Sequence, residues 1–276
     1  MHASTKEWFE MIQPMAARVP LMIAVGNHEY DHLSGGFGKD PSGVLTDGGF
    51  NPVWGDYADD SGGECGVPTA ARFTMPFVGK DTSNRTHDSN GVFWYSYDMS
   101  NVHVVVISSE HDLSEGSPQH SWLQEDLSLV NREVTPWVIM ESHRPLYESQ
   151  IMGRANEVAE SLRNEIERLL REYNVDLVLS GHYHSYLRTC NGPSQGICGN
   201  GGPVHITVGT AGAPLLTTPL YSQYLSFTES FIVSWGYGRL TVMNSTALLF
   251  EFVGDKDGEV KDSVWLTKEW TLNANE

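Results

Sequence analysis

Histidine and asparagine side chains follow three apolar segments of the sequence, where they could act together as metal ligands. In chain order these motifs are Gly26-Asn27-His28-Glu29, Glu141-Ser142-His143 and Gly181-His182-Tyr183-His184. Imidazole nitrogen binds Zn, Fe and Mn, and the amide oxygen of Asn27 would add a harder, neutral ligand. His182 and His184 are two positions apart, so on an extended segment their side chains point the same way. The spacing therefore predicts a metal site built from several strand ends, because such ends open onto one edge of a sheet.

Each of these histidines has a simpler interpretation when it is taken alone. A single histidine at a strand end is more often a hydrogen-bonded surface residue than a ligand, but three such motifs together favour a common site. We expect structural or solvent-exposed roles for six of the histidines outside them: His32, His87, His103, His111, His120 and His205. Gly26 and Gly181 are expected to let the chain turn sharply as it leaves its strand.

Hydrophobic periodicity predicts the elements that must position the motifs. We expect helices over 4–17, from Ser117-Pro118 onward and over 155–173, and strands over 19–25, 102–107, 136–140, 175–180 and 204–208. The segment 102–107 is largely β-branched, which is typical of a strand buried on both faces. Residues 31–90 show no sustained period and are expected to form a long loop. A hairpin is expected within 239–253.

The order of these elements indicates the fold class. Strands and helices alternate from about residue 100 to 208, which is typical of an α/β layered domain. An aromatic, strand-like segment over 91–99 favours a second sheet, and therefore a sandwich rather than one open sheet.

Length and charge exclude several functions. The chain has 276 residues, 40% of them hydrophobic, which is enough for one large core. Its formal net charge of −18 argues against nucleic acid as a partner, because no basic stripe is available to neutralise phosphates. No apolar run approaches the length of a membrane span. A phosphate-bearing substrate would need local positive charge, from a metal or a helix N-terminus.

Cysteines and glycosylation sequons bear on the compartment. Cys190 and Cys198 could close a small disulfide loop in a secreted protein, whereas three buried thiols with Cys65 would suit a cytosolic one. The sequons at Asn84 and Asn244 favour secretion. Residues 1–6 do not resemble a signal peptide, and Ser4-Thr5-Lys6-Glu7 is typical of a capping box that opens a helix.

Longer segments around the motifs resemble the purple acid phosphatases, within the calcineurin-like metallophosphoesterases. The similar segments are Gly26–Glu29, Gly63–Pro68, Trp94–Ser96, Ser121–Leu123, His143–Tyr147, Gly181–Thr189 and Gly236–Leu240. The resemblance implies an α/β fold, a metallophosphoesterase-type αββα sandwich of two mixed sheets. We expect residues 1–276 to form a single partial metallophosphoesterase domain, with C-terminal purple acid phosphatase-type strands from about 203–276.

The resemblance also implies a reaction, which is hydrolysis of small phosphate monoesters by a metal-bound hydroxide at a binuclear centre. Asn27, His143 and His182 would bind a divalent ion (Zn, Mn or Fe), and His184 would bind the other ion, usually Fe(III). His28 would contact the phosphate and protonate the leaving group. Arg144 is expected to support its turn rather than the phosphate. The family further implies a secreted, extracellular or vacuolar location.

Two further motifs of the family, Asp-x-Gly and Gly-Asp-x-x-Tyr, have no counterpart here. We expect a truncated chain that lacks the first strand or strands, the N-terminal β-sandwich domain and part of the Fe(III) site. Gly55-Asp56-Tyr57-Ala58-Asp59 has the wrong spacing to replace the second motif. The alternative is a catalytically inactive remnant that acts as a metal-binding or interaction protein.

Overall fold

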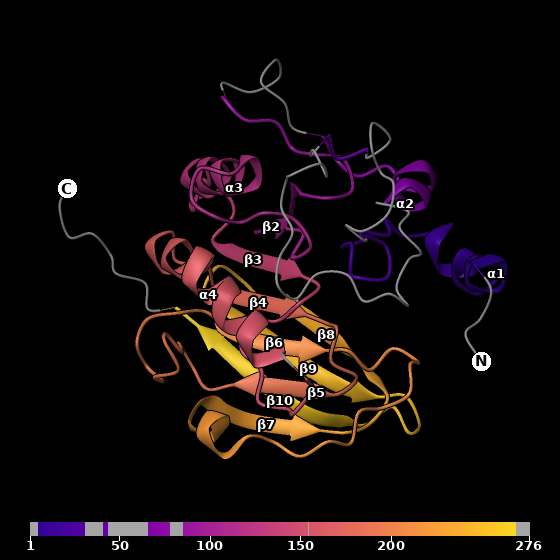
Figure 1. Ribbon diagram of the computed structural model, residues 1–276, viewed down its shortest axis with the longest axis vertical. Helices are drawn as coiled ribbons and strands as arrows, with labels where there is room; N and C mark the ends of the chain where they lie inside the picture. The colour runs from indigo at the N-terminus through magenta and orange to yellow at the C-terminus, as the bar shows by residue number, and fades with distance from the viewer. Residues whose placement is uncertain (1–4, 31–40, 44–65, 78–84, 154, 269–276) are drawn as a thin grey trace.

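A computed structural model describes most of the chain and arranges it as two β-sheets with flanking helices (Figure 1). The residues described are 5–30, 41–43, 66–77, 85–153 and 155–268. The helices are α1 (Thr5–Ala16), α2 (Val67–Arg72), α3 (Pro118–Ser128) and α4 (Ala155–Glu172), with a 3-10 helix, η1, over Ser222–Phe227. The strands are β1 (Tyr95–Met99), β2 (Val102–Val106), β3 (Trp137–Ser142), β4 (Leu177–Ser180), β5 (Tyr186–Thr189), β6 (Val204–Val208), β7 (Thr228–Ile232), β8 (Gly236–Val242), β9 (Ala247–Gly254) and β10 (Val260–Thr267).

The larger sheet has seven strands in the order β1-β2-β3-β4-β6-β5-β7. Its centre is parallel, since β2, β3, β4 and β6 run in one direction, and β1, β5 and β7 pair antiparallel at the sides. All five residues of β2 are buried, as its β-branched sequence predicts. Ser142 at the end of β3 lies opposite Ser180 at the end of β4. The loops that carry His143 and His182 therefore leave the sheet side by side.

The large sheet lies between helices and the small sheet. Figure 1 shows α3 and α4 on one face, with the strands β8, β9 and β10 on the other. α3 begins at Pro118, and the Ser117 side chain caps it by accepting a hydrogen bond from the His120 backbone N–H at 3.3 Å. Between the sheets, the Tyr186 ring stacks on Phe252 with centroids 4.3 Å apart. This packing fixes the parallel strands from both sides.

The α/β sandwich class is confirmed, with two details corrected. The large sheet is mixed, but the small sheet is antiparallel throughout, in the order β10-β9-β8, because hairpin-like connections join its strands. The expected strand at 19–25 does not form a ladder. The Ile23 backbone N–H donates to the Tyr95 hydroxyl instead, and that hydroxyl donates to the Ile23 carbonyl oxygen, so a side chain replaces a strand partner.

Other elements were absent from the sequence prediction. The short strand β5 was not predicted, and α2 lies inside the segment expected to be loop. The strands β7 and β10 fall in the segment from about 203, where strands were expected without individual bounds. α2 begins after Gly66, which has a left-handed conformation (φ 72°), and it carries a proline in its first turn. His32, Gly55–Asp59, Cys65 and Asn84 lie outside the described residues.

The expected Cys190–Cys198 disulfide is present, with the Cα atoms 5.8 Å apart and a sequence separation of eight. It closes the loop between β5 and β6. Among the helices that the structure describes, none has both the length and the apolar content that crossing a bilayer requires.

Candidate metal centre

Three ligand atoms from distant parts of the chain converge at the carboxyl ends of β3 and β4. His143 Nε2 lies 2.6 Å from Asn27 Oδ1 and 3.0 Å from His182 Nδ1. His182 Nδ1 lies 3.0 Å from Asn27 Oδ1. The structure thus brings together three of the four predicted metal ligands.

Backbone geometry holds these three side chains close together. The Gly181 N–H donates to the His143 carbonyl oxygen at 3.0 Å, which joins the two loops just beyond the paired strands. His182 itself has a positive φ of 66°, a conformation that is uncommon for a residue with a side chain. That strained backbone turns the imidazole back over the sheet edge toward Asn27.

Gly26 has a different role from the one expected. It has no positive φ, so it does not serve as a flexible turn. A Cβ atom at this position would lie 2.7 Å from His143 Nδ1, within the space that the imidazole ring occupies. Gly181 also has no positive φ, and a Cβ there would lie 3.9 Å from the same nitrogen, an ordinary contact. Gly26 is therefore a spacer that lets the His143 ring pack against the Asn27 loop.

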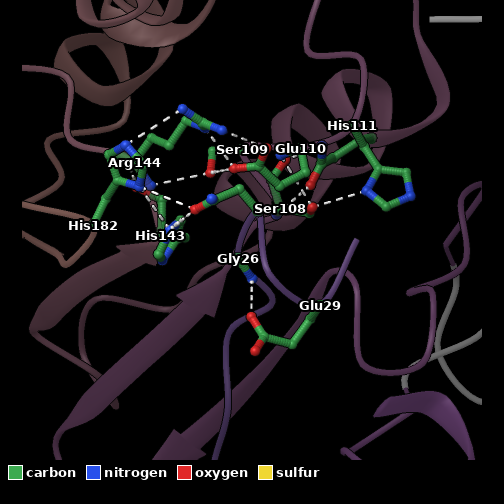
Figure 2. Close-up of polar contacts among 12 residues, drawn as sticks. Gly26, Glu29, Ser108, Ser109, Glu110, His111, His143, Arg144 and His182 are labelled. Atoms are coloured by element: carbon green, nitrogen blue, oxygen red, sulfur yellow. Dashed lines mark hydrogen bonds and ion pairs between the residues drawn. The ribbon is translucent and has the colours of Figure 1, made fainter. Parts of the chain in front are cut away.

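A buried ion pair supports the site from the side (Figure 2). Arg144 is 2% exposed, and its Nε and Nη2 donate to the two carboxylate oxygens of Glu110 at 2.7 and 3.1 Å. Arg144 Nη1 lies 3.4 Å from His182 Nε2, on the side of the ring opposite Asn27. The Arg144 backbone N–H donates to Ser109 Oγ at 3.0 Å. The buried guanidinium braces the turn and the His182 ring, as the sequence prediction for Arg144 states.

Burial keeps the central imidazoles neutral. It lowers the pKa of His143 to about 3, and the nearby charges of Arg144, His28 and His184 add to that effect. Burial likewise lowers the pKa of His182 to about 2, assisted by His143, Arg144, His184 and His28. Metal ions bind the neutral imidazole, so neither side chain needs to lose a proton at ordinary pH before it can act as a ligand.

His184 is oriented for binding, but it lies outside the triangle that Asn27 Oδ1, His143 Nε2 and His182 Nδ1 form. Its Nδ1 donates to the Pro214 carbonyl oxygen at 2.8 Å, which leaves Nε2 as the nitrogen with a lone pair. Gln150 is fully buried and anchors the same loop, because its Nε2 donates to the carbonyl oxygens of Leu216 and Thr218 at 2.8 and 3.1 Å. The Leu216 N–H in turn donates to the His184 carbonyl oxygen at 2.9 Å.

His28 is exposed beside the buried Asn27. Its charge acts on both central histidines, so it lies within electrostatic reach of them. The structure places His28 and His184 around the triangle rather than in it.

The set of donor atoms fits one divalent ion. Two neutral imidazoles and one amide oxygen are suitable ligands for Zn, Mn or Fe(II). Ligand atoms around one tetrahedral zinc lie roughly 3.3 Å from each other, and the three atoms here are somewhat closer together than that. Within the described part of the chain, no group of three or more His, Cys, Asp and Glu side chains is placed to hold an ion. A hard Fe(III) ion at His184 would need further ligands, and no such cluster of His, Cys, Asp and Glu side chains is found among the described residues.

Comparison with known proteins agrees with this geometry. The calcineurin-like phosphoesterase model matches residues 3–186, and the model described as iron/zinc purple acid phosphatase-like protein C matches residues 202–263. The structure of purple acid phosphatase PPD1 from yellow lupin (Lupinus luteus) seeds superposes with a TM-score of 0.74 and 27% identity, covering 96% of this chain and 43% of that one. The chain belongs to the purple acid phosphatases of the calcineurin-like phosphoesterase family.

Relatives within this family differ in their stated activity. Probable inactive purple acid phosphatase 9 of Arabidopsis thaliana is 36% identical over 94% of this chain and 40% of its own length. A nucleotide pyrophosphatase/phosphodiesterase of Hordeum vulgare is 32% identical over 94% of this chain and 66% of its own length. Purple acid phosphatase 18 of Arabidopsis thaliana is 32% identical over 93% of this chain and 51% of its own length. The chain therefore spans between about two fifths and two thirds of these relatives.

Sequence reasoning missed the residues that hold the candidate metal ligands in place. Glu110 follows the predicted strand at 102–107, and that position is the signal that could have found it. Gln150 lies in a loop without a motif, and its role follows from contacts with the chain near residue 216, which sequence alone does not reveal.

Proposed function

We propose that the chain carries the divalent-metal site of a metal-dependent acid phosphatase that hydrolyses phosphoric monoesters. The observation that carries this proposal is the convergence of Asn27 Oδ1, His143 Nε2 and His182 Nδ1 within 3.0 Å of one another. Membership of a phosphoesterase family supports the same reaction class. The bound ion would supply Lewis acidity toward the phosphoryl oxygen and a nucleophile near neutral pH.

The residues around that ion have distinct roles. Asn27, His143 and His182 hold it, and the burial of the two imidazoles keeps them unprotonated. The exposed His28 contacts the phosphate and donates a proton to the leaving oxygen, which removes the negative charge that forms as the ester bond breaks. His184 offers Nε2 to a second ion, because Nδ1 is occupied by Pro214.

A direct test uses the full chain of 276 residues, loaded in turn with Zn, Mn and Fe. The metal content per chain and the turnover of 4-nitrophenyl phosphate at acidic pH are measured. We expect at least one tightly bound ion and turnover that the His143→Ala variant loses. His87, which is bonded to Glu125 on the surface, provides the control variant His87→Ala. A folded, metal-loaded chain without turnover contradicts the proposal.

A second candidate is a catalytically inactive phosphoesterase that retains metal or partner binding. It is favoured by the names of relatives such as probable inactive purple acid phosphatases 9 and 27. The incomplete ligand set at His184 within the described residues agrees with it. The same experiment separates the two candidates, since the inactive form is expected to bind one ion and to release no product.

We further propose that the protein is a secreted or vacuolar glycoprotein. Its binuclear centre would hold Fe(III) together with Zn, Mn or Fe. The chain would form one partial domain, whose C-terminal strands begin at about residue 203. The Cys190–Cys198 disulfide supports an oxidising compartment. Asn244 supports glycosylation, because it is exposed at the turn between β8 and β9. Mass spectrometry of the protein from its native source tests both modifications.

A further inference from the structure

An exposed tryptophan, Trp235, is bonded to the same loop that orients His184. Trp235 Nε1 donates to the Ala213 carbonyl oxygen at 3.0 Å. His184 Nδ1 donates to the carbonyl oxygen of the next residue, Pro214, at 2.8 Å. Neighbouring residues are 3.8 Å apart at their Cα atoms, so the indole nitrogen and the His184 imidazole lie within about 10 Å of each other.

The chain around Trp235 is fixed against the end of β6. Thr210 Oγ1 donates to the Gly236 carbonyl oxygen at 2.7 Å, and the Gly236 N–H donates back to the Thr210 carbonyl oxygen at 3.4 Å. A Cβ atom at Gly238 would lie 3.7 Å from the Val208 side chain, so β8 passes close to the strand. The indole is therefore held at the same sheet edge as the metal ligands.

The ring is available for binding from this position. It is 50% exposed, although its one polar group already has a partner. Trp265 is exposed to a similar degree, so exposure alone does not mark the ring; what marks Trp235 is its hydrogen bond to the loop that orients His184. Every aromatic base or aryl group offers a π-face that can stack on an indole.

We propose that Trp235 is a stacking surface for the planar aromatic leaving group of the substrate, a nucleoside or an aryl alcohol. This inference rests on the proposed phosphatase function. The phosphate binds beside Asn27, His143 and His182, and the ester carries the aromatic group across His184 toward the indole. Trp235 thereby favours aromatic phosphoesters over aliphatic ones.

The test compares three probe substrates on the metal-loaded full chain: adenosine 5′-monophosphate, 4-nitrophenyl phosphate and glycerol 3-phosphate. We expect Trp235→Ala to lower kcat/KM for the aromatic esters by about fivefold to twentyfold, within the range of one stacked ring, and to leave glycerol 3-phosphate unchanged. Adenosine 5′-monophosphate and 4-nitrophenyl phosphate distinguish a nucleoside from a simple aryl group. Trp265→Ala is the matched control, because Trp265 is 52% exposed on β10.

A second variant separates stacking from a purely structural role. Trp235→Phe loses the hydrogen bond to Ala213 but keeps an aromatic face, so we expect it to retain most of the preference for aromatic esters. An equal loss for all three substrates in Trp235→Ala, or a Phe variant as defective as the Ala variant, overturns the inference in favour of a loop anchor.

Binding distinguishes failure of this inference from failure of the proposed function. If no substrate is turned over, calorimetric titration of adenosine 5′-monophosphate and of glycerol 3-phosphate gives the same comparison without catalysis. A weaker affinity of Trp235→Ala for the nucleotide alone supports stacking. Equal affinities of the wild-type and variant chains for the nucleotide, or no binding of it, overturn it.

Discussion

Two groups of histidines at the large sheet differ in their surroundings. His143 and His182 follow β3 and β4 and face an amide oxygen and each other. His103 lies near the start of β2, where Nδ1 bonds to Asp98 at 2.6 Å and Nε2 to Asp126 at 2.9 Å. Burial and neighbouring cations lower the pKa of the first pair, whereas for His103 the two carboxylates outweigh burial and raise the pKa.

The difference separates a structural histidine from the candidate metal ligands. His103 is held as a cation in a network that also contains Arg85 and Ser96, which both donate to Asp126 Oδ1 at 2.7 Å. A carboxylate pair of this kind uses both ring nitrogens and leaves no lone pair. His143 and His182 are kept neutral, and their ring nitrogens converge on the amide oxygen of Asn27. This convergence, and not burial alone, marks them as candidate ligands, since His205 on β6 is also buried without a carboxylate partner among the described residues.

Removing the carboxylate at the centre of the His103 network should have the largest effect. Asp126→Ala leaves Arg85 and His103 buried without their shared partner, and we expect a loss of about 3–5 kcal/mol in the free energy of unfolding. Urea titration measures it. Glu251→Ala, which breaks the exposed pair with Arg239, is the control and should cost at most about 1 kcal/mol. If Asp126→Ala lowers zinc affinity by as much free energy as it lowers stability, the His103 network and the candidate metal site are not independent.

A side chain at Gly26 should weaken the candidate metal site and leave the His103–Asp126 network unchanged. Gly26→Ala pushes a methyl group into the His143 ring, and we expect kcat/KM for 4-nitrophenyl phosphate and zinc affinity to fall by about a hundredfold. Calorimetric titration with zinc measures the affinity. Gly181→Ala, whose Cβ meets only a 3.9 Å contact, should behave like the wild type. Equal defects in both variants would contradict the spacer role.

Loosening the loop that orients His184 should have an intermediate effect. Gln150→Leu removes the hydrogen bonds to Leu216 and Thr218, and we expect metal affinity to fall by about tenfold, typical of a residue that supports a ligand. Nitrogen NMR of the histidine rings should show that His184 no longer holds its proton on Nδ1. Thr218→Val keeps the carbonyl acceptor and serves as control. An unchanged His184 tautomer in Gln150→Leu would refute this role.

The smallest effect concerns the pH dependence of stability. The pKa of His103 is raised in the folded state, so the folded chain binds this proton more tightly than the unfolded chain does. Its contribution is complete below the unfolded pKa of about 6.5 and is lost as pH rises through the folded value. His103→Gln should abolish that part of the profile. A variant profile identical to that of the wild type would show that the carboxylates do not hold a cation.

In the metal-free protein, His143 and His182 should change the stability with pH in the opposite direction. The pKa values of His143 and His182 are lowered to about 3 and about 2, so the unfolded chain binds their protons more readily. Stability should therefore decrease as pH falls from about 6.5 toward those values. Thermal unfolding in chelator across this pH range, with the double variant His143→Phe/His182→Phe as control, checks the sign.

The sequence predicted the site better than it predicted its supports. His143 and His182 could be found because the parallel strands β3 and β4 release their carboxyl ends at one edge, whereas Asn27 follows a segment that forms no ladder, so its assignment rests on the family resemblance. The structural role of His103 was predicted, but its partner could not be, because Asp126 lies on a helix 23 positions away. The apolar run at 19–25 is buried only in part. It forms no strand, because strand pairing needs a neighbouring strand, which hydrophobic periodicity does not identify.

The chain separations within the ligand triangle connect metal binding to folding. Asn27 is 116 positions from His143 and 155 from His182, so the triangle closes only after very long loops have been ordered. Contacts of such high sequence separation slow folding and are absent from locally structured intermediates. A metal ion bound at this candidate site would therefore be held only by molecules that have completed folding, and its removal by a chelator would destabilise the native state alone. A metal assay performed during refolding would follow the last step of assembly, when the first and last motifs of the site meet.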